Sequence, residues 1–130
     1  MNVIFIIGLP ASGKTRLAYD IRTDEYLIDD PTTETLRLPD DSCDLIITDP
    51  NLCNADILAS AEDMISKKYA PDVLTFQRIY FANNPEQCLY NAVNREDNET
   101  KKVDSMIKQM SKIYNPPETA RPVFVSSNRG

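Results

Sequence analysis

The chain of 130 residues is long enough for one domain with its own core, and 42% of its residues are hydrophobic. Its net charge of −6 disfavours tight binding to long nucleic acids and to anionic membranes, because like charges repel. It contains no histidine, which removes histidine general bases, histidine-activated nucleophiles and most zinc sites, so proton transfer would fall to carboxylates.

The N-terminal segment predicts a strand, a phosphate-binding loop and a helix. Val3–Ile7 is a short apolar, β-branched run, typical of a strand that is buried on both faces. The next eight residues, GLPASGKT, match the pattern G-x-x-x-x-G-K-[ST] of phosphate loops. Beyond them, Leu17, Ala18 and Ile21 fall on one face of a predicted helix. A strand before this pattern and a helix after it are the context in which the pattern binds nucleotide.

This loop contains both internal glycines of the chain, Gly8 and Gly13; the third glycine is the last residue. Glycine lets the backbone approach phosphate oxygens closely, so that N–H groups can surround them. We expect Lys14 to reach the β- and γ-phosphates and Thr15 to ligate Mg²⁺. The residues predicted to contact ATP are Gly8, Pro10, Ala11, Ser12, Gly13, Lys14, Thr15 and Arg16. The alternative is a glycine-containing turn without a ligand.

Two carboxylates follow the second predicted strand, Glu25–Ile28. Parallel strands direct their C-terminal ends to the edge of the sheet where ligands bind, so we expect Asp29 and Asp30 to face the γ-phosphate from the acceptor side. One of them, with Asp30 ahead of Asp29, is the predicted general base for the acceptor hydroxyl. An ordinary turn is the alternative, since Asp-Asp-Pro is common in turns. The polar segment that follows has room for a short helix over residues 33–38.

The third predicted strand, Asp44–Thr48, is followed by Asp49. In phosphate-loop proteins an aspartate at this position commonly completes the Mg²⁺ site, so we predict Thr15 and Asp49 as metal ligands. Asp49 is also suited to cap a helix that starts with Pro50, and the two roles are compatible. A long helix comes next, and its predicted inner face contains Ile57, Leu58, Ala61, Met64 and Ile65.

The last third of the chain predicts one strand, two helices and a candidate fifth strand. The fourth strand, Val73–Phe81, precedes a helix with Asn84 as its cap, Pro85 as its first residue and Gln87 completing a capping box. The predicted inner face of this helix contains Cys88, Leu89, Ala92 and Val93. The final helix ends before the two prolines at 116–117, and its inner face is predicted to contain Val103, Met106, Ile107, Met110 and Ile113. Val123–Val125 is the candidate fifth strand.

Residues 94–100 form a charged connector between these two helices. Arg95 is predicted to close over the phosphates as a lid arginine and to stabilise charge in the transition state. The alternative is a solvated surface run. Positive charge is concentrated in this part of the chain, which includes Arg95, Lys101, Lys102, Lys108 and Lys112. These residues could hold a short single-stranded nucleic-acid end, although the chain as a whole is acidic.

Strands that alternate with helices predict an α/β fold, here a kinase-type P-loop NTPase with a doubly wound parallel sheet of four to five strands flanked by helices. Residues 1–125 are expected to form one P-loop kinase-like domain and 126–130 a polar tail. No apolar run approaches the ~20 residues of a membrane span, so no membrane partner is expected. Three cysteines without a CxxC pair suit a reducing cytoplasm, the host cytoplasm if the protein is phage-encoded.

The chain resembles the 5′-hydroxyl kinase domain of phage polynucleotide kinases and related small P-loop kinases. Three segments carry the resemblance: IIGLPASGKT, DLIITDPNL, and the stretch from NPEQCLYNAVNRE to KKVDSMIKQMSKIYNPP. It implies Lys14 and Thr15 at phosphate and Mg²⁺, an aspartate after the second strand as general base, and Arg95 as the lid arginine. Two departures concern the acceptor side. In that family an arginine that grips the acceptor phosphate usually follows the aspartate closely, whereas here the nearest candidate is Arg37, seven residues after Asp30. The segment between the second and third strands is also short.

Motif and resemblance together predict ATP-dependent, Mg²⁺-assisted transfer of the γ-phosphoryl group to a hydroxyl. The expected acceptor is a 5′-hydroxyl of a nucleic acid or nucleotide. The alternatives are a small-molecule or nucleoside kinase and a non-kinase ATP-binding module or ATPase. ATP and Mg²⁺ are the expected cofactors, and a nucleotide and short single-stranded nucleic-acid ends are the expected partners. The oligomeric state is not predicted.

Overall fold

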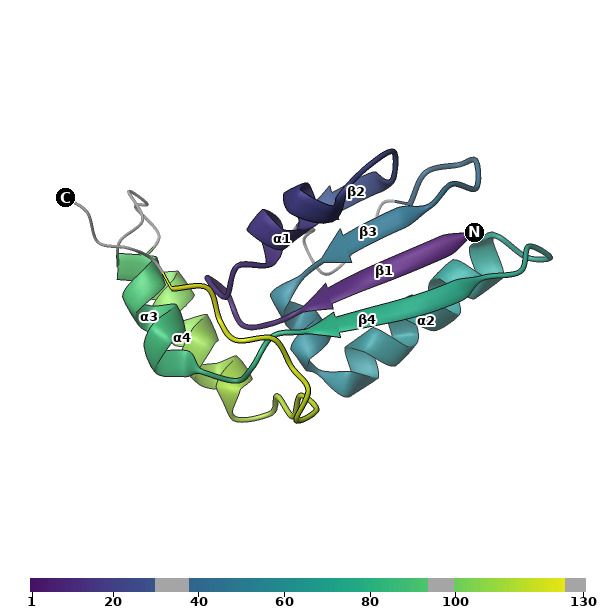
Figure 1. Ribbon diagram of the computed structural model, residues 1–130. Coiled ribbons are helices and arrows are strands. Elements are labelled where there is room, and N and C mark those ends of the chain that lie inside the picture. Colours follow the sequence, from purple (N-terminus) through teal and green to yellow (C-terminus); the bar gives the residue numbers. More distant parts are fainter. Residues whose placement is uncertain (30–37, 94–99, 126–130) are drawn as a thin grey trace.

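The computed structural model describes residues 1–29, 38–93 and 100–125 (Figure 1). Its strands form one parallel sheet in the order β2-β3-β1-β4. The four strands are β1 (Asn2–Ile7), β2 (Tyr26–Asp29), β3 (Leu45–Thr48) and β4 (Thr75–Tyr80). β1 therefore lies inside the sheet between β3 and β4, which suits a strand that is apolar at every position after Asn2.

Different helices cover the two faces of the sheet. On one face Phe5 and Ile47 share a buried cluster with Leu58 of α2, and on the other Ile6 shares a cluster with Leu17 of α1. The helices are α1 (Lys14–Ile21), α2 (Ala55–Lys68), α3 (Pro85–Val93) and α4 (Thr100–Ser111), with a 3₁₀ turn, η1 (Pro50–Cys53). α3 and α4 pack side by side beyond the C-terminal ends of the strands (Figure 1). The predicted α/β fold, with a parallel sheet flanked by helices, is confirmed.

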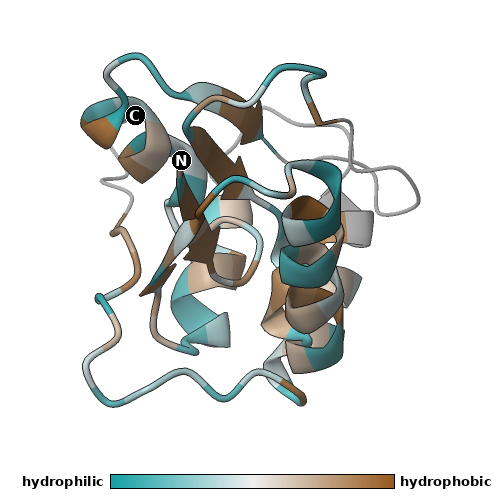
Figure 2. Cartoon of the chain, turned by 90° about the vertical axis from the view of Figure 1, so that its right-hand side faces the viewer, coloured by the Kyte–Doolittle hydropathy of each residue, from teal (hydrophilic) through white to brown (hydrophobic). Residues whose placement is uncertain are grey.

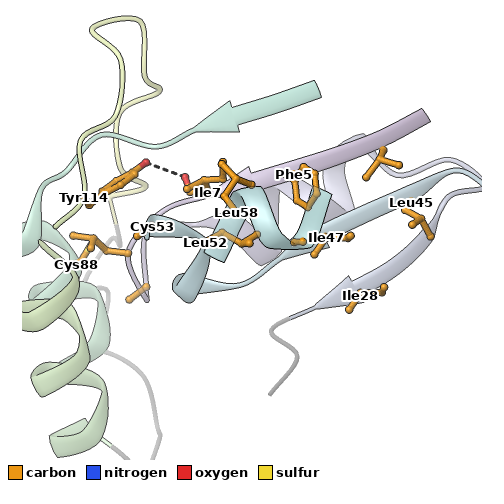
Figure 3. Packing of buried hydrophobic residues seen from close by; sticks show 14 of the residues in the cluster. Phe5, Ile7, Ile28, Leu45, Ile47, Leu52, Cys53, Leu58, Cys88 and Tyr114 are labelled. Atoms are coloured by element: carbon orange, nitrogen blue, oxygen red, sulfur yellow. Dashed lines mark hydrogen bonds between the residues drawn. The ribbon is translucent and has the colours of Figure 1, made fainter. Parts of the chain in front are cut away.

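The hydrophobic core follows the strands. Hydrophobic residues gather in the central strands, whereas the helices that surround them also carry hydrophilic residues (Figure 2). Tyr114 closes the core at the end where the strands point (Figure 3). Its hydroxyl donates to the carbonyl of Ile7 at 3.1 Å and is also bonded to the carbonyl of Phe81, while burial raises the pKa of this phenol. Tyr114 thereby holds the ends of β1 and β4 together at the point where the phosphate loop begins.

Val123–Val125 does not form the fifth strand that the sequence predicts. Beside β4 there is a single parallel bridge, between Phe81 and Arg121. The proline that follows Arg121 has no N–H with which to extend the pairing. The N–H of Phe124 donates instead to the carbonyl of Ser12 at 3.0 Å. The C-terminal segment therefore pairs with the phosphate loop rather than continuing along β4, and the sheet of the described residues has four strands.

The inner faces of the helices are narrower than predicted. In α2, Leu58, Ala61 and Ile65 are buried, but Ile57 and Met64 are exposed at 37% and 47%. Successive helical residues are ~100° apart, so the immediate neighbours of Leu58 and Ile65 turn away from a single sheet face. The prediction is wrong for the same reason at three positions in and after the other helices, Val93, Met106 and Ile113.

The start of α3 is close to the prediction. Pro85 is its first residue, and the side-chain oxygen of Asn84 accepts the N–H of Gln87 at 3.2 Å. The side chain of Gln87 donates to Asn91 rather than returning to the backbone of Asn84, so the capping box is only half formed. The helix predicted over residues 33–38 lies almost entirely outside the described residues. Within the described ranges, no helix is long and apolar enough to cross a membrane.

Candidate functional site

The two internal glycines stand where any side chain would collide with a neighbour. A Cβ on Gly13 would lie 2.8 Å from the Cβ of Phe124, and Gly13 has a φ of 107°, in the left-handed region. A Cβ on Gly8 would lie 2.5 Å from Oγ of Ser12 and 3.0 Å from Cβ of Phe81. The loop therefore approaches itself and the C-terminal segment so closely that only glycine fits at both ends.

Lys14 is the first residue of α1, and its side chain folds back against the loop. Its Nζ donates to the carbonyl of Leu9 at 2.9 Å, and the residue is 7% exposed. The N–H of Ser12 donates to the same carbonyl at 3.2 Å, and Ala11, between them, has a φ of 64°. Because a buried ammonium needs polar partners, the bond to the Leu9 carbonyl in this tight turn also fixes the position of the lysine.

The predicted nucleotide-contact residues divide into a buried loop and an exposed first helical turn. The buried ones are Gly8, Pro10, Ala11, Ser12 and Lys14, with Gly13 partly exposed. Thr15 and Arg16 are exposed. Oγ of Ser12 has no hydrogen-bond partner within the described part of the chain. In such a loop the backbone N–H groups, together with the side chains at the start of α1, are the groups available to a ligand.

Asp29 links α1 and β3 through hydrogen bonds to one side chain from each. Its Oδ1 accepts the hydroxyl of Thr15 at 2.9 Å and the hydroxyl of Thr48 at 2.6 Å. Thr15 belongs to the first turn of α1 and Thr48 is the last residue of β3, where it pairs in register with Asp29. The structure thus places one carboxylate of the predicted pair beside the predicted metal ligand.

Asp49 caps η1, the role that the sequence left open beside metal binding. Its Oδ1 accepts the backbone N–H of Asn51 at 2.9 Å and the side-chain amide of Asn51 at 3.0 Å. The carboxylate is 6% exposed. Cys53 lies nearby, and burial raises the pKa of its thiol to about 12, while Lys14 opposes that shift and Cys88 and Asp49 add to it. The thiol is therefore neutral at physiological pH, in agreement with the absence of a redox or metal pattern among the cysteines.

A pocket of about 180 Å³ opens beside the N-terminus of α1. The guanidinium of Arg16 stacks 4.4 Å above the ring of Phe124 at this pocket. The pocket is lined by Gly13, Arg16, Leu17, Asp20, Phe81, Arg121, Pro122 and Phe124. Of these lining residues, only Gly13 and Arg16 are among the ligand contacts predicted from the sequence. Phe124 and Arg121 were missed because the chain brings them to the loop from more than 100 residues away.

Asn91, on α3, was also missed. It is 5% exposed, and its side-chain amide donates to the carbonyls of Ala11 at 2.9 Å and Phe124 at 2.6 Å. A buried asparagine two residues before the end of α3 has no sequence motif to identify it. Its position in the structure links α3 to the phosphate loop. Lys108 and Lys112 are exposed at and just beyond the end of α4.

Three predicted residues, Asp30, Arg37 and Arg95, lie outside the described residues. Among the residues that the structure describes, no group of three or more His, Cys, Asp or Glu side chains could hold a metal ion by itself. Mg²⁺ commonly needs fewer protein ligands, since it binds through one or two carboxylates together with substrate phosphates and water. The hydroxyl of Thr15 beside the carboxylate of Asp29 is a set of hard oxygen donors of that kind. The residues present thus fit a nucleotide-bound Mg²⁺.

The chain matches no model of a known protein family, and no solved structure matches it. It is 31% identical over 121 residues to the uncharacterized protein R277 of Acanthamoeba polyphaga mimivirus. The alignment covers 87% of this chain and 86% of the mimivirus protein, so the similarity extends well beyond the eight residues of the phosphate loop.

Proposed function

The chain belongs to the same family as the mimivirus protein R277, and we propose that it is a P-loop kinase that transfers the γ-phosphoryl group of ATP to a hydroxyl. The observation that carries this proposal is the loop between buried β1 and α1, with Lys14 folded against it. Backbone N–H groups of the loop over residues 8–13, in which only Pro10 has none, and the N-terminus of α1 would surround the phosphates. The Lys14 ammonium would exchange the Leu9 carbonyl for a phosphate oxygen, a stronger charge-assisted partner.

The base of the nucleotide has a suitable pocket next to the loop. The opening at Gly13 is bordered by the aromatic ring of Phe124 and by Arg16, both able to stack on a purine. The pocket begins at the residue where the phosphate loop ends, so one ligand could occupy both. This arrangement supports a nucleoside triphosphate rather than inorganic phosphate as the natural ligand.

Mg²⁺ would be held by Thr15 and an aspartate. The candidates are Asp29, already bonded to Thr15, and Asp49, which has the capping role described above. When bound, the ion would neutralise charge on the β- and γ-phosphates. The hydroxyl of Thr48 would keep Asp29 turned toward α1.

Asp30 is the proposed general base. Oδ1 of Asp29 accepts two hydroxyls, which ties that carboxylate to α1 and β3 and favours its neighbour for proton transfer from the acceptor. Arg95, two residues beyond the end of α3, is the proposed lid arginine. The rest of the catalysis would come from positioning and charge stabilisation.

We propose a 5′-hydroxyl of a short nucleic acid or nucleotide as the acceptor, on the resemblance of the lid segment and the last helix to polynucleotide kinases. Exposed Lys108 and Lys112 could contact its phosphates. A non-kinase ATP-binding module is the second candidate, favoured by the short connection of 15 residues between Asp29 and Leu45. A small-molecule or nucleoside kinase remains the alternative within the same reaction class. Free thiols at Cys43, Cys53 and Cys88 suit the reducing cytoplasm predicted for it.

The proposal is tested by incubating the full chain with γ-labelled ATP, Mg²⁺ and a panel of acceptors. The panel contains a short oligonucleotide with a 5′-hydroxyl, the same oligonucleotide with a 5′-phosphate, and nucleosides. Label on the 5′-hydroxyl oligonucleotide alone is the expected result. Label on nucleosides only would indicate the nucleoside kinase. ATP binding in a calorimeter without transfer to any acceptor would favour the binding module, and absence of ATP binding would overturn the proposal as a whole.

A further inference from the structure

Three segments that are distant in sequence meet at the side chain of Asn91. Its Nδ2 donates to the Ala11 carbonyl in the phosphate loop at 2.9 Å and to the Phe124 carbonyl in the C-terminal segment at 2.6 Å. Its Oδ1 accepts the side-chain amide of Gln87 at 2.9 Å, one turn earlier on α3. Because Gln87 occupies the oxygen with a donor, the nitrogen of Asn91 is the end that faces the two carbonyls.

The two carbonyls that Asn91 holds belong to the two halves of the proposed nucleotide site. Ala11 has a φ of 64°, a conformation that a residue with a side chain seldom adopts unless its surroundings impose it. Phe124 borders the base pocket, and its N–H donates to the Ser12 carbonyl at 3.0 Å. Thus Phe124 is bonded to the loop once directly and once through Asn91.

We propose that Asn91 is a positioning residue that makes the phosphate loop and the base pocket respond to a nucleotide as one unit. This inference rests on the proposed function, since it assigns the loop and the pocket to a single nucleoside triphosphate. A two-donor amide is what the position requires. Aspartate, of nearly the same shape, has no donor when ionised and would place a negative charge beside two carbonyl oxygens. Alanine would leave both carbonyls buried without this donor.

Coupling through Asn91 and simple packing predict different ATP affinities when Asn91 and Phe124 are both substituted. If Asn91 connects the halves, loss of the Phe124 ring should weaken ATP binding only while Asn91 is present to hold that ring in register with the loop. If the halves are independent, the Phe124→Ala and Asn91→Ala effects should add, as they do for residues without a shared partner. Inorganic tripolyphosphate, which lacks a base, reports on the loop alone.

The experiment measures the affinity of the full chain for ATP and for tripolyphosphate by calorimetry, in a double-mutant cycle of Asn91→Ala and Phe124→Ala. We expect each single substitution to weaken ATP binding about tenfold, and the second substitution to add about twofold or less in the background of the first. Tripolyphosphate binding should weaken in Asn91→Ala but not in Phe124→Ala. Asn115→Ala, at an exposed asparagine after α4, is the matched control and should change neither affinity.

Additive effects on ATP binding, or an unchanged ATP affinity in folded Asn91→Ala, would overturn the inference while leaving the kinase proposal intact. If Asn91→Ala does not fold, Asn91→Ser takes its place in the cycle, because serine keeps one donor and leaves a smaller void than alanine does. A wild-type chain that binds neither ATP nor tripolyphosphate would overturn the proposed function and this inference together.

Discussion

The phosphate loop and the surroundings of Asp29 lie at the same edge of the sheet, but their polar groups are held differently. Lys14 is buried, and its ammonium is bonded to the carbonyl of Leu9, five residues before it. Asp29 is exposed, and its carboxylate is bonded to side chains of α1 and β3, 14 and 19 residues away. The position of Lys14, on the proposed donor side, is therefore fixed by a short-range bond within the loop, although Asn91 and Phe124 also tie that loop to α3 and the C-terminal segment. The position of Asp29, on the proposed acceptor side, depends on how α1 packs against β3.

This difference predicts that substitutions on the two sides will separate binding from transfer. The largest effect is expected at Asp30. Asp30→Asn should lower the rate of phosphoryl transfer by about 10²–10⁴-fold, because the acceptor hydroxyl would lose its proposed general base. ATP affinity should stay within about twofold of wild type, since the donor loop is unchanged. Steady-state transfer and calorimetric ATP titration check the two parts.

Asp29→Asn is the matched control for Asp30→Asn, since the two residues are adjacent and chemically identical. It should act through the apparent Mg²⁺ affinity, because an amide is a weaker ligand than a carboxylate. An inactive Asp29→Asn together with an active Asp30→Asn would exchange the two assignments. Full activity in both variants would remove the general base from this pair of residues.

On the donor side, Lys14→Ala should weaken ATP binding by about tenfold or more, the value of one charge-assisted hydrogen bond of about 1.5–3 kcal/mol. The fold should survive, because the Leu9 carbonyl keeps the N–H of Ser12 as a partner. Titration with ATP and Mg²⁺ measures the loss, and circular dichroism establishes folding. Lys67→Ala, at an exposed lysine in the last turn of α2, is the control. Equal ATP affinity in folded Lys14→Ala and wild type would contradict the phosphate-loop assignment.

Gly13→Ala tests whether the donor side is shaped by steric fit. The new Cβ would lie 2.8 Å from Cβ of Phe124 and would hold alanine at a φ of 107°. A side chain in so sparse a region costs about 1–3 kcal/mol, so the free energy of unfolding in urea should fall by that amount. Ser60→Ala, exposed on α2, should leave it within about 0.5 kcal/mol of wild type. A loss no larger than that of the control would show that the loop can relax around a side chain.

The sequence predicts the loop and the strand and helix on either side of it because that information is local. Eight consecutive residues specify the loop, Val3–Ile7 specifies the strand before it, and Leu17 with Ala18 specifies the helix after it, all of which the structure contains. The cap of η1 by Asp49 is local in the same way. Strand β1, helix α1 and the cap by Asp49 were predicted correctly because the pattern that specifies each of them lies within a short window.

The missed features are those in which one segment competes with another for a partner. Val123–Val125 has the composition of a strand, yet Phe124 bonds to the loop, and nothing in three residues identifies which partner prevails. Asn91 reads as one polar residue in a helix, and its two acceptors lie 80 and 33 residues away in sequence. Val93 shows the converse, since it is an apolar residue that is 65% exposed although it lies on a helix.

The smallest effect, and the one that most sharpens the contrast between the two sides, is expected at Thr48. Thr48→Val keeps the shape of the side chain and removes the hydroxyl that donates to Asp29 at 2.6 Å. Asp29 would retain the hydroxyl of Thr15, so we expect the free energy of unfolding to fall by only about 0.5–1.5 kcal/mol, the net contribution of one hydrogen bond. If that bond keeps Asp29 turned toward α1, the Mg²⁺ concentration for half-maximal ATP binding should rise by about two- to tenfold. Binding of ATP at saturating Mg²⁺ should not change, because Thr48 lies outside the predicted phosphate loop, residues 8–15. Thr75→Val, at an exposed threonine at the start of β4, is the matched control and should alter neither the stability nor the Mg²⁺ dependence.

A Thr48→Val protein could instead be less stable but keep the wild-type Mg²⁺ dependence. The bonds of Asp29 to Thr15 and Thr48 would then be only a structural link between α1 and β3, and Asp49 would be left as the proposed carboxylate partner of Thr15.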